Sequence, residues 1–214
     1  MIEVHSLVVG PISANCHILH HAETAEAVVV DPGDDAPVIL EFLQRIGARV
    51  VAIWNTHAHI DHINANAAVK AATGAAISIH RGEADWLPSP AKTLAVWAGV
   101  DFHPSEADHL WEDGQELTVL GEKWFVHHTP GHSPGMCCIV CPAAELMLSG
   151  DLLFRSSIGR TDLPGGDPDA MEQSLARLFG DWGRDSWRVY SGHGGPTTIG
   201  QERRTNPFVN VPMR

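Results

Sequence analysis

The chain has 214 residues, 44% of them hydrophobic, which suffices for one globular domain or for two packed halves. Its formal net charge of −12 argues against nucleic-acid binding, because phosphate contacts require a basic surface. The N-terminus lacks the basic and apolar segments of a signal peptide, and no apolar run is long enough to span a bilayer. We therefore expect a cytoplasmic protein with no membrane or nucleic-acid partner. Assembly into a homo-oligomer stays open on the sequence.

Short apolar runs separated by Gly, Pro and Asn predict strands throughout the first half of the chain. We expect these strands at Glu3–Val9, Cys16–His20, Ala27–Asp31, Val50–Trp54 and Ala76–His80. A helix is expected after Asp35 as its N-cap, because Ile39, Phe42, Leu43 and Ile46 follow at helical spacing before Gly47. A second helix is predicted over about 62–73, and one or two irregular helices over 82–112.

The second half predicts more strands and two further helices. The expected strands are Leu117–Leu120, Trp124–His128, Met136–Cys141, Leu146–Ser149 and Trp187–Tyr190. Asp167 and Pro168 predict the start of a helix with the apolar stripe Met171, Leu175, Leu178 and Phe179. Thr198 and Gln201 form a possible capping box for a short last helix.

This layout predicts an α/β protein. In each half several strands precede the helices, without strict strand–helix–strand alternation, which favours a four-layer αβ/βα sandwich of two mixed β-sheets with outer helices. We expect a single domain over residues 1–214, built from two packed halves of roughly 1–112 and 113–214.

Candidate metal ligands follow four of the apolar runs. His57, His59, Asp61 and His62 fall within six consecutive positions directly behind one predicted strand. Residues placed just past the ends of buried strands are aimed by a rigid scaffold, so they often assemble into sites. The same placement recurs further along the chain, at His132, Asp151 and His193. Imidazole and carboxylate groups in this number predict a metal site.

The remaining histidines are assigned structural or surface roles, because nothing comparable surrounds them. They are His5, His17, His20, His21, His80, His103, His109, His127 and His128. Asp31 is different, because it ends a strand and is placed to orient a ligand imidazole.

The four cysteines predict free thiols. Cys137, Cys138 and Cys141 lie too close together for a disulfide framework, and Cys16 supplies no second pair for a zinc ribbon. Buried free thiols on strands are the expected state, which agrees with a reducing compartment.

The motifs THAHIDH, GHSPG, SGDLLF and GHG, in this order and at these separations, resemble the metallo-β-lactamase superfamily over nearly the whole chain. The segments SSIGRTDLPGGD (156–167) and TTIGQERRTNPF (197–208) are similar to short, single-domain bacterial members of its glyoxalase-II-like branch, the hydroxyacylglutathione hydrolase-like proteins. The resemblance implies the metallo-β-lactamase fold. It also implies two divalent metal ions. Zinc is the first candidate, and iron and manganese are the alternatives.

The resemblance further implies a distribution of the ligands. One ion would be held by His57, His59 and His132, the other by Asp61, His62 and His193, and Asp151 would bridge both. A hydroxide bridging the ions would attack the carbonyl of a small-molecule substrate, an acyl-glutathione or a related thioester. Asp61 is the candidate catalytic proton acceptor, although a metal-bound carboxylate is a weak base.

Arg160 is the candidate for binding substrate, since a guanidinium pairs with a carboxylate through two hydrogen bonds. The alternative is an Arg160–Asp162 pair that shapes its loop. Full-length glyoxalase II carries a C-terminal helical extension that helps to grip glutathione. About twenty residues follow His193, so we expect that extension to be missing and glutathione recognition to be weakened.

Three other functions stay open on the sequence. A persulfide dioxygenase of the same fold would use one iron on His57, His132 and Asp151. Hydrolysis of a β-lactam or lactone is the second alternative, and metal binding without catalysis is the third. Metal content per chain separates the first alternative from a binuclear hydrolase.

Overall fold

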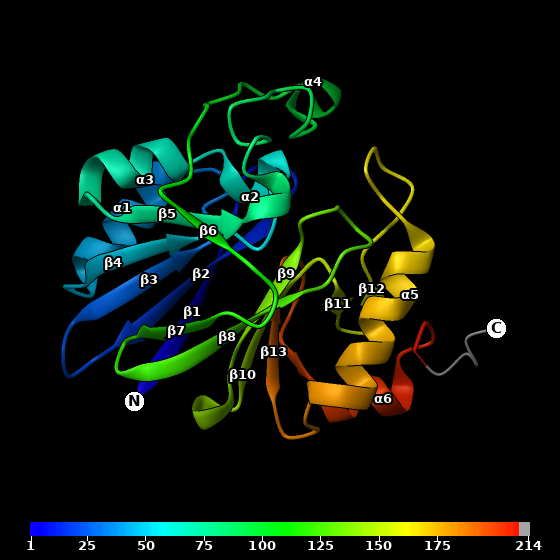
Figure 1. Ribbon diagram of the computed structural model, residues 1–214. Helices are drawn as coiled ribbons and strands as arrows, with labels where there is room; N and C mark the ends of the chain where they lie inside the picture. Colours follow the sequence, from blue (N-terminus) through cyan, green and yellow to red (C-terminus); the bar gives the residue numbers. More distant parts are fainter. Residues whose placement is uncertain (210–214) are drawn as a thin grey trace. The chain divides into compact units, whose positions relative to one another are not determined.

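The computed structural model describes residues 1–209, and the chain divides into two compact units (Figure 1). Unit 1 is Met1–Trp111, and unit 2 begins at Glu112. Each unit contains one six-stranded mixed sheet with helices, so the predicted α/β class with two mixed sheets is confirmed. That both units form a single domain stays a prediction.

Unit 1 has the strand order β1-β2-β3-β4-β5-β6. Strands β1 to β3 pair antiparallel, whereas β3 to β6 pair parallel, each parallel connection crossing over through helical or irregular chain. The strands are β1 (Ile2–Val9), β2 (Ala14–His21), β3 (Glu26–Val30), β4 (Arg49–Trp54), β5 (Ala76–His80) and β6 (His109–Trp111). The helices are α1 (Ala36–Arg45), α2 (Ile60–Ile63), α3 (Asn66–Thr73), η1 (Arg81–Glu83) and α4 (Ala95–Ala98).

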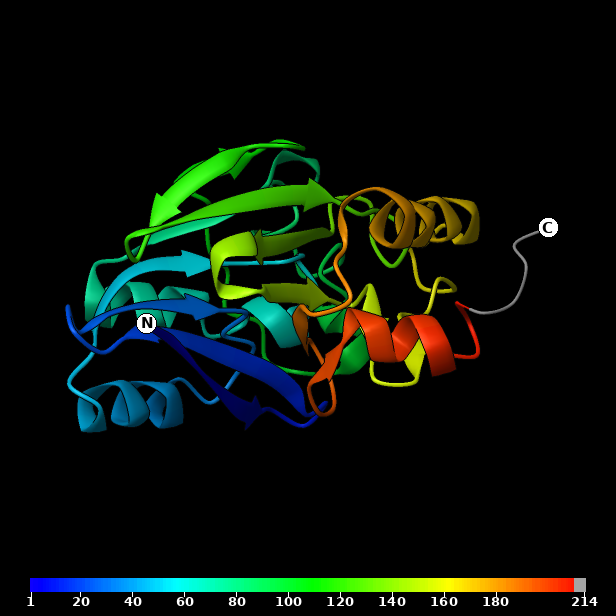
Figure 2. The ribbon, with the colours of Figure 1, turned by 90° about the horizontal axis from the view of Figure 1, so that it is seen from below.

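The five strands predicted in this half are confirmed. The prediction that strands and helices do not alternate is wrong for this half. Helix α1 joins the parallel strands β3 and β4, and α2 with α3 joins β4 and β5. Apolar residues of α1 and α3 pack into one core with the sheet, among them Ile39, Val69 and Ile53. In Figure 2 the darkest blue strand, β1, lies at the edge of this sheet beside β2.

Two details in unit 1 differ from the sequence predictions. The helix expected over 62–73 is broken into α2 and α3, because the Ala65 amide donates to the Pro32 carbonyl at 2.9 Å. Asp35 precedes α1 as expected, but its side chain does not cap the helix and instead accepts a hydrogen bond from the Gly10 amide at 2.9 Å. In both places a tertiary hydrogen bond replaces the local pattern.

Unit 2 has the strand order β14-β13-β10-β9-β8-β7, in which only β10 and β13 pair parallel among the described strands. The strands are β7 (Glu116–Val119), β8 (Glu122–His128), β9 (Cys137–Cys141), β10 (Leu146–Gly150), β13 (Arg188–Ser191) and β14 (Thr197–Thr198), with a separate pair β11 (Leu153–Phe154) and β12 (Ser157–Ile158). The helices are η2 (Pro142–Ala144), α5 (Pro168–Arg177), the π-helix η3 (Leu178–Trp182) and α6 (Ile199–Thr205).

The helix starts predicted in unit 2 are confirmed. Asp167 Oδ1 accepts hydrogen bonds from the amides of Asp169 and Ala170, at 2.9 and 3.0 Å, and so caps α5. Thr198 Oγ1 likewise accepts from the Gln201 amide at 3.1 Å. The Gln201 side chain donates to Thr205 instead of returning to the cap, so the box is only half formed.

The irregular stretch predicted over 82–112 contains short helical turns and one strand that the sequence did not predict, β6. Asp108 fixes this strand, since its carboxylate accepts from the Ile77 amide at 2.8 Å and pairs with Lys70 at 2.6 Å. Among residues 1–209, no helix combines the length and apolar character needed to cross a bilayer. A cytoplasmic location stays a prediction.

Asp108 generates a prediction about stability and pH. The hydrogen bond from Lys70, followed by that from the Ile77 amide, lowers the pKa of Asp108. Because the folded pKa lies below the unfolded value of about 3.9, the carboxylate stabilises the fold above about pH 4, and this contribution is lost as pH falls through the folded pKa. Asp108→Asn should therefore lower the free energy of unfolding at pH 7, and the difference from the wild type should shrink toward pH 3.

Urea unfolding across that pH range measures the effect. The matched control is Glu106→Gln, which removes a charge from the same segment. Equal pH dependence of Asp108→Asn and the wild type would contradict the role of the Asp108 carboxylate.

Candidate functional site

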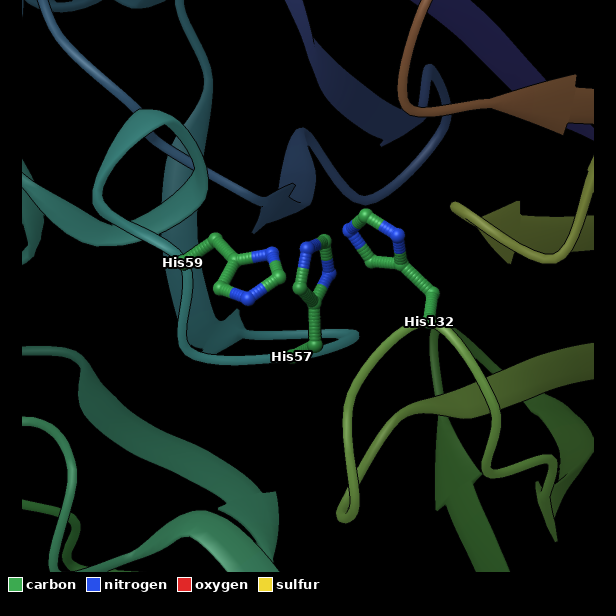
Figure 3. Close-up of side chains that lie close together, drawn as sticks. All are labelled: His57, His59 and His132. Carbon is green, nitrogen blue, oxygen red and sulfur yellow. The ribbon is translucent and has the colours of Figure 1, made fainter. Parts of the chain in front are cut away.

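The first cluster of predicted ligands lies on the loop after β4. This strand ends at Trp54, and His59 is the residue from which α2 begins. His57 and His59 are buried, and their ring centroids are 4.8 Å apart in an edge-to-face arrangement. Figure 3 shows both imidazoles projecting from this loop. The loop thus presents two imidazoles within reach of a common ligand.

Asp61 and His62 continue this cluster on α2. The His62 ring is buried and lies 4.1 Å from the His57 ring, centroid to centroid. The half-buried Asp61 places Oδ2 3.5 Å from His62 Nε2. Ligand atoms of Asp31, His57 and His62 all lie within 4.8 Å of one another. The four predicted ligands of unit 1 therefore lie in a row of neighbours, with His59 beside His57, His57 beside His62 and His62 beside Asp61.

Asp31 orients two of these residues, as the sequence suggested for one imidazole. Its buried carboxylate accepts from the Thr56 amide at 2.7 Å and from the Thr56 hydroxyl at 2.6 Å. It also lies 3.1 Å from His62 Nδ1, and Thr56 Oγ1 lies 3.1 Å from His57 Nδ1. Because a carboxylate only accepts, the proton of His62 lies on Nδ1, which directs the lone pair of Nε2 toward Asp61.

Two further residues hold the loop, and the sequence analysis missed both. Glu83 is fully buried, and its Oε2 accepts from the Ala58 amide, between His57 and His59, at 2.6 Å. Glu83 lies in a stretch without a readable pattern, so no local signal marks it. A Cβ added to Gly33 would lie 1.5 Å from the Asp61 carbonyl oxygen, so only glycine permits this approach. The turn sequence after β3 marks Gly33 only as a loop residue.

Unit 2 holds a second set of predicted ligands. Asp151 directly follows β10, and His193 lies two residues after β13. These strands are parallel neighbours, so both side chains come from the same edge of the sheet. His132 lies on the loop between β8 and β9, and Figure 3 shows its imidazole at the tip of that loop. Asp151 Oδ2 is 3.4 Å from His132 Nε2 and 3.6 Å from His193 Nε2. One carboxylate oxygen thus lies near two imidazole nitrogens.

The segment after β12 orients His132. The Arg160 carbonyl accepts from His132 Nδ1 at 2.8 Å, which leaves Nε2 directed at Asp151. Gly159 allows this approach, because an added Cβ would lie 1.8 Å from the Asp151 carbonyl oxygen and 3.3 Å from His132 Nδ1. The sequence marked this segment by resemblance, but not the role of Gly159.

The Arg160 side chain is exposed and forms the pair with Asp162 that the sequence left open as an alternative. Its Nε and Nη2 donate to the two oxygens of Asp162, each at 2.7 Å. This hydrogen bonding lowers the pKa of Asp162 to about 2. Contact between Arg160 and a substrate stays a prediction.

The cysteines are free and buried, as predicted. Burial raises the pKa of the Cys138 thiol to about 12 and raises that of Cys16 further still. The pKa of Cys141 is also raised, with burial as the largest cause. Thiols protonated at neutral pH are poor nucleophiles, so Cys16, Cys138 and Cys141 do not offer thiolate catalysis.

Comparison with known proteins identifies the family. The model of the metallo-β-lactamase superfamily matches residues 9–193, a span that includes all seven predicted ligands. The chain belongs to the metallo-β-lactamase superfamily.

Two curated relatives illustrate the range of functions. The chain is 34% identical over 203 residues to the probable metallo-hydrolase YqgX of Bacillus subtilis, covering 94% of this chain and 95% of the relative. It is 29% identical over 205 residues to the hydroxyacylglutathione hydrolase GloC of Haemophilus influenzae, covering 94% and 96%.

Two solved structures share the fold. BLEG-1, a B3 metallo-β-lactamase, has a TM-score of 0.91 at 38% identity, covering 97% of this chain and all of that one. TTHA1623, solved in a di-iron-bound form, has a TM-score of 0.85 at 36% identity, covering 95% and 99%. The protein is therefore a member of a metallo-hydrolase superfamily, with His and Asp residues suited to divalent metal ions.

The close approach of Gly33 to α2 generates a stability prediction. Gly33→Ala places a methyl group against the Asp61 carbonyl, so the backbone must shift, and the free energy of unfolding should fall by about 3 kcal/mol. Gly180→Ala is the control, because an added Cβ there meets nothing within 4 Å. It should change stability by less than about 0.5 kcal/mol. Urea unfolding measures both, and equal stabilities would contradict this packing.

Proposed function

We propose that the protein is a metal-dependent hydrolase of acyl thioesters, with glutathione thioesters as the first substrates to test. The similarity to the Haemophilus influenzae hydroxyacylglutathione hydrolase, which extends over 94% of this chain, carries the proposal. The sequence resemblance to the glyoxalase-II-like branch, in the segments 156–167 and 197–208, supports it.

We further propose a binuclear centre with the ligands distributed as the resemblance implies. His57, His59 and His132 would hold one ion, Asp61, His62 and His193 the other, and Asp151 would bridge them. The matched span of the family model includes both ligand sets, and the similar protein TTHA1623 binds two irons. Zinc is the first candidate, with iron or manganese as alternatives, since all three accept nitrogen and oxygen ligands.

The distances between the proposed ligand atoms in unit 2 fit coordination of zinc. Two ligand atoms bound tetrahedrally at ~2.0–2.1 Å from one zinc lie about 3.3 Å apart. Asp151 Oδ2 lies 3.4 Å from His132 Nε2 and 3.6 Å from His193 Nε2. The proposed ligands therefore need little rearrangement around Asp151 when metal binds.

The roles of the protein groups follow from their contacts. Two bound divalent ions would supply a water of lowered pKa and polarise the thioester carbonyl. Asp31 holds His62 by its Nδ1 atom, and the Arg160 carbonyl holds His132 in the same way, so both rings keep one orientation. Asp61 would accept the proton of the attacking water. The Arg160 guanidinium would bind a substrate carboxylate on release from Asp162.

The proposed bridge makes a direct prediction about metal content. Asp151→Ala should reduce the metal content of the purified protein from about two ions per chain to less than about one, because both ions lose a ligand. Elemental analysis of protein purified without added metal measures this. Asp169→Ala, an exposed carboxylate on α5, is the control and should keep both ions. Two tightly bound ions in Asp151→Ala would overturn the bridging role.

The substrate class is tested on one purified sample with zinc, iron or manganese. We expect thiol release from S-lactoylglutathione, with no oxygen uptake when glutathione persulfide is supplied. Oxygen uptake with persulfide, in the absence of thioester cleavage, would overturn the proposal in favour of a dioxygenase.

Hydrolysis of β-lactams is the second candidate, and the similarity to BLEG-1 at 38% identity favours it. The same sample should therefore also be assayed with a chromogenic cephalosporin. The two activities are compared by kcat/KM. A higher value for opening of the β-lactam ring than for thioester cleavage would identify the protein as a β-lactam hydrolase.

A further inference from the structure

Three potential metal ligands gather on one face of the β1–β2 pair, outside both ligand sets described above. Glu3 lies directly opposite His20 in the antiparallel register, and His5 lies two residues after Glu3 on β1. Because side chains alternate along a strand, all three project from the same face. Ligand atoms of Glu3, His5 and His20 lie within 4.8 Å of one another, and Glu3 Oε2 is 3.7 Å from His5 Nε2.

Each of the two imidazoles has a buried nitrogen atom. His20 is only 8% exposed, and neither His20 Nε2 nor His5 Nε2 has a hydrogen-bond partner among the described residues. A buried polar atom without a partner is unfavourable, so these nitrogens are suited to an additional ligand. The Phe42 ring of α1 packs 5.2 Å from the His5 ring, centroid to centroid, and limits its rotation. The exposed Glu3 side chain leaves access from solvent.

We propose that Glu3, His5 and His20 form an additional divalent cation site, for which zinc is the best-suited ion. Two imidazole nitrogens and one carboxylate oxygen are typical zinc ligands, and the exposed side of Glu3 leaves a fourth position for water. Ligand atoms on one zinc are about 3.3 Å apart, so closing the site requires small rotations, mainly of the exposed Glu3. The geometry depends only on β1 and β2 and is independent of the proposed hydrolase function.

The proposal has a structural consequence. Strand β1 is the edge strand of the unit 1 sheet, and among the described strands its partner is β2. An ion bound by Glu3 and His5 on β1 and by His20 on β2 links the two strands through their side chains. Zinc binding at this site therefore stabilises the edge of unit 1 by mass action, since it binds the folded state only.

The test uses the full-length protein with its proposed hydrolase centre already loaded, titrated with zinc chloride. The variants are Glu3→Gln, His5→Gln and His20→Gln, each of which removes one ligand. His21→Gln is the matched control, because it follows His20 on β2 and faces the opposite side, where its Nε2 lies 3.4 Å from the N-terminal amine. Calorimetry counts bound zinc, and NMR of 15N-labelled histidine reports each imidazole nitrogen.

We expect the wild type and His21→Gln to bind one zinc more per chain than the three ligand variants, with shifts of the Nε2 resonances of His5 and His20. Zinc at a hundredfold excess over its Kd should raise Tm by about 5 °C in the wild type but not in Glu3→Gln. Glu3→Gln and His5→Gln decide the test if His20→Gln fails to fold. Equal numbers of bound zinc ions in all proteins, with unshifted His5 and His20 resonances, would overturn the proposed zinc site. An ordered water would then be the partner of the two buried nitrogens.

Discussion

The arrangement of the unit 1 ligand loop depends on the carboxylate of Asp31. This group lies just past β3 and accepts hydrogen bonds from the amide and the hydroxyl of Thr56, after the next strand, and lies within hydrogen-bond distance of His62 Nδ1 on α2. A buried charge is very unfavourable unless several donors surround it, so removing any one of these donors is destabilising. One side chain thereby fixes the end of β3, the loop after β4 and an imidazole orientation.

Buried carboxylates perform the same task elsewhere in each unit. Glu83 holds the backbone between His57 and His59 through the Ala58 amide. In unit 2, the fully buried Glu202 accepts from the Ser156 amide at 2.8 Å and from Asn206 Nδ2 at 2.9 Å. Ser156 begins the segment whose Arg160 carbonyl holds His132. The loops that carry the candidate ligands are therefore anchored by charge-assisted hydrogen bonds, which are stronger than neutral ones and keep these side chains positioned.

The sequence predicted what local patterns determine. Apolar runs marked the strands, and the residues just past them marked the candidate ligands, since a strand end is visible in one stretch of sequence. Contacts across long separations were not predictable in this way: Asp31 reaches Thr56 and Glu83 reaches Ala58, each over 25 positions. Strand β6 was missed because His109–Trp111 is too short for a period-two pattern and is fixed by Asp108 instead. His5 and His20 were assigned structural or surface roles, because their proximity arises only from strand pairing.

The contrast between buried and exposed groups also explains why membership of the superfamily leaves the substrate open. The proposed ligand residues and the carboxylates that anchor them are mostly buried, so substitutions there disturb both packing and charge pairing. The Arg160–Asp162 pair is exposed on the surface of its loop, where substitutions have little effect on stability. Residues of this kind can change the molecule that is bound while the metal ligands stay the same. Under the proposed function, substrate choice would reside in exposed loop side chains such as Arg160, whereas the chemistry would reside in the residues at the strand ends.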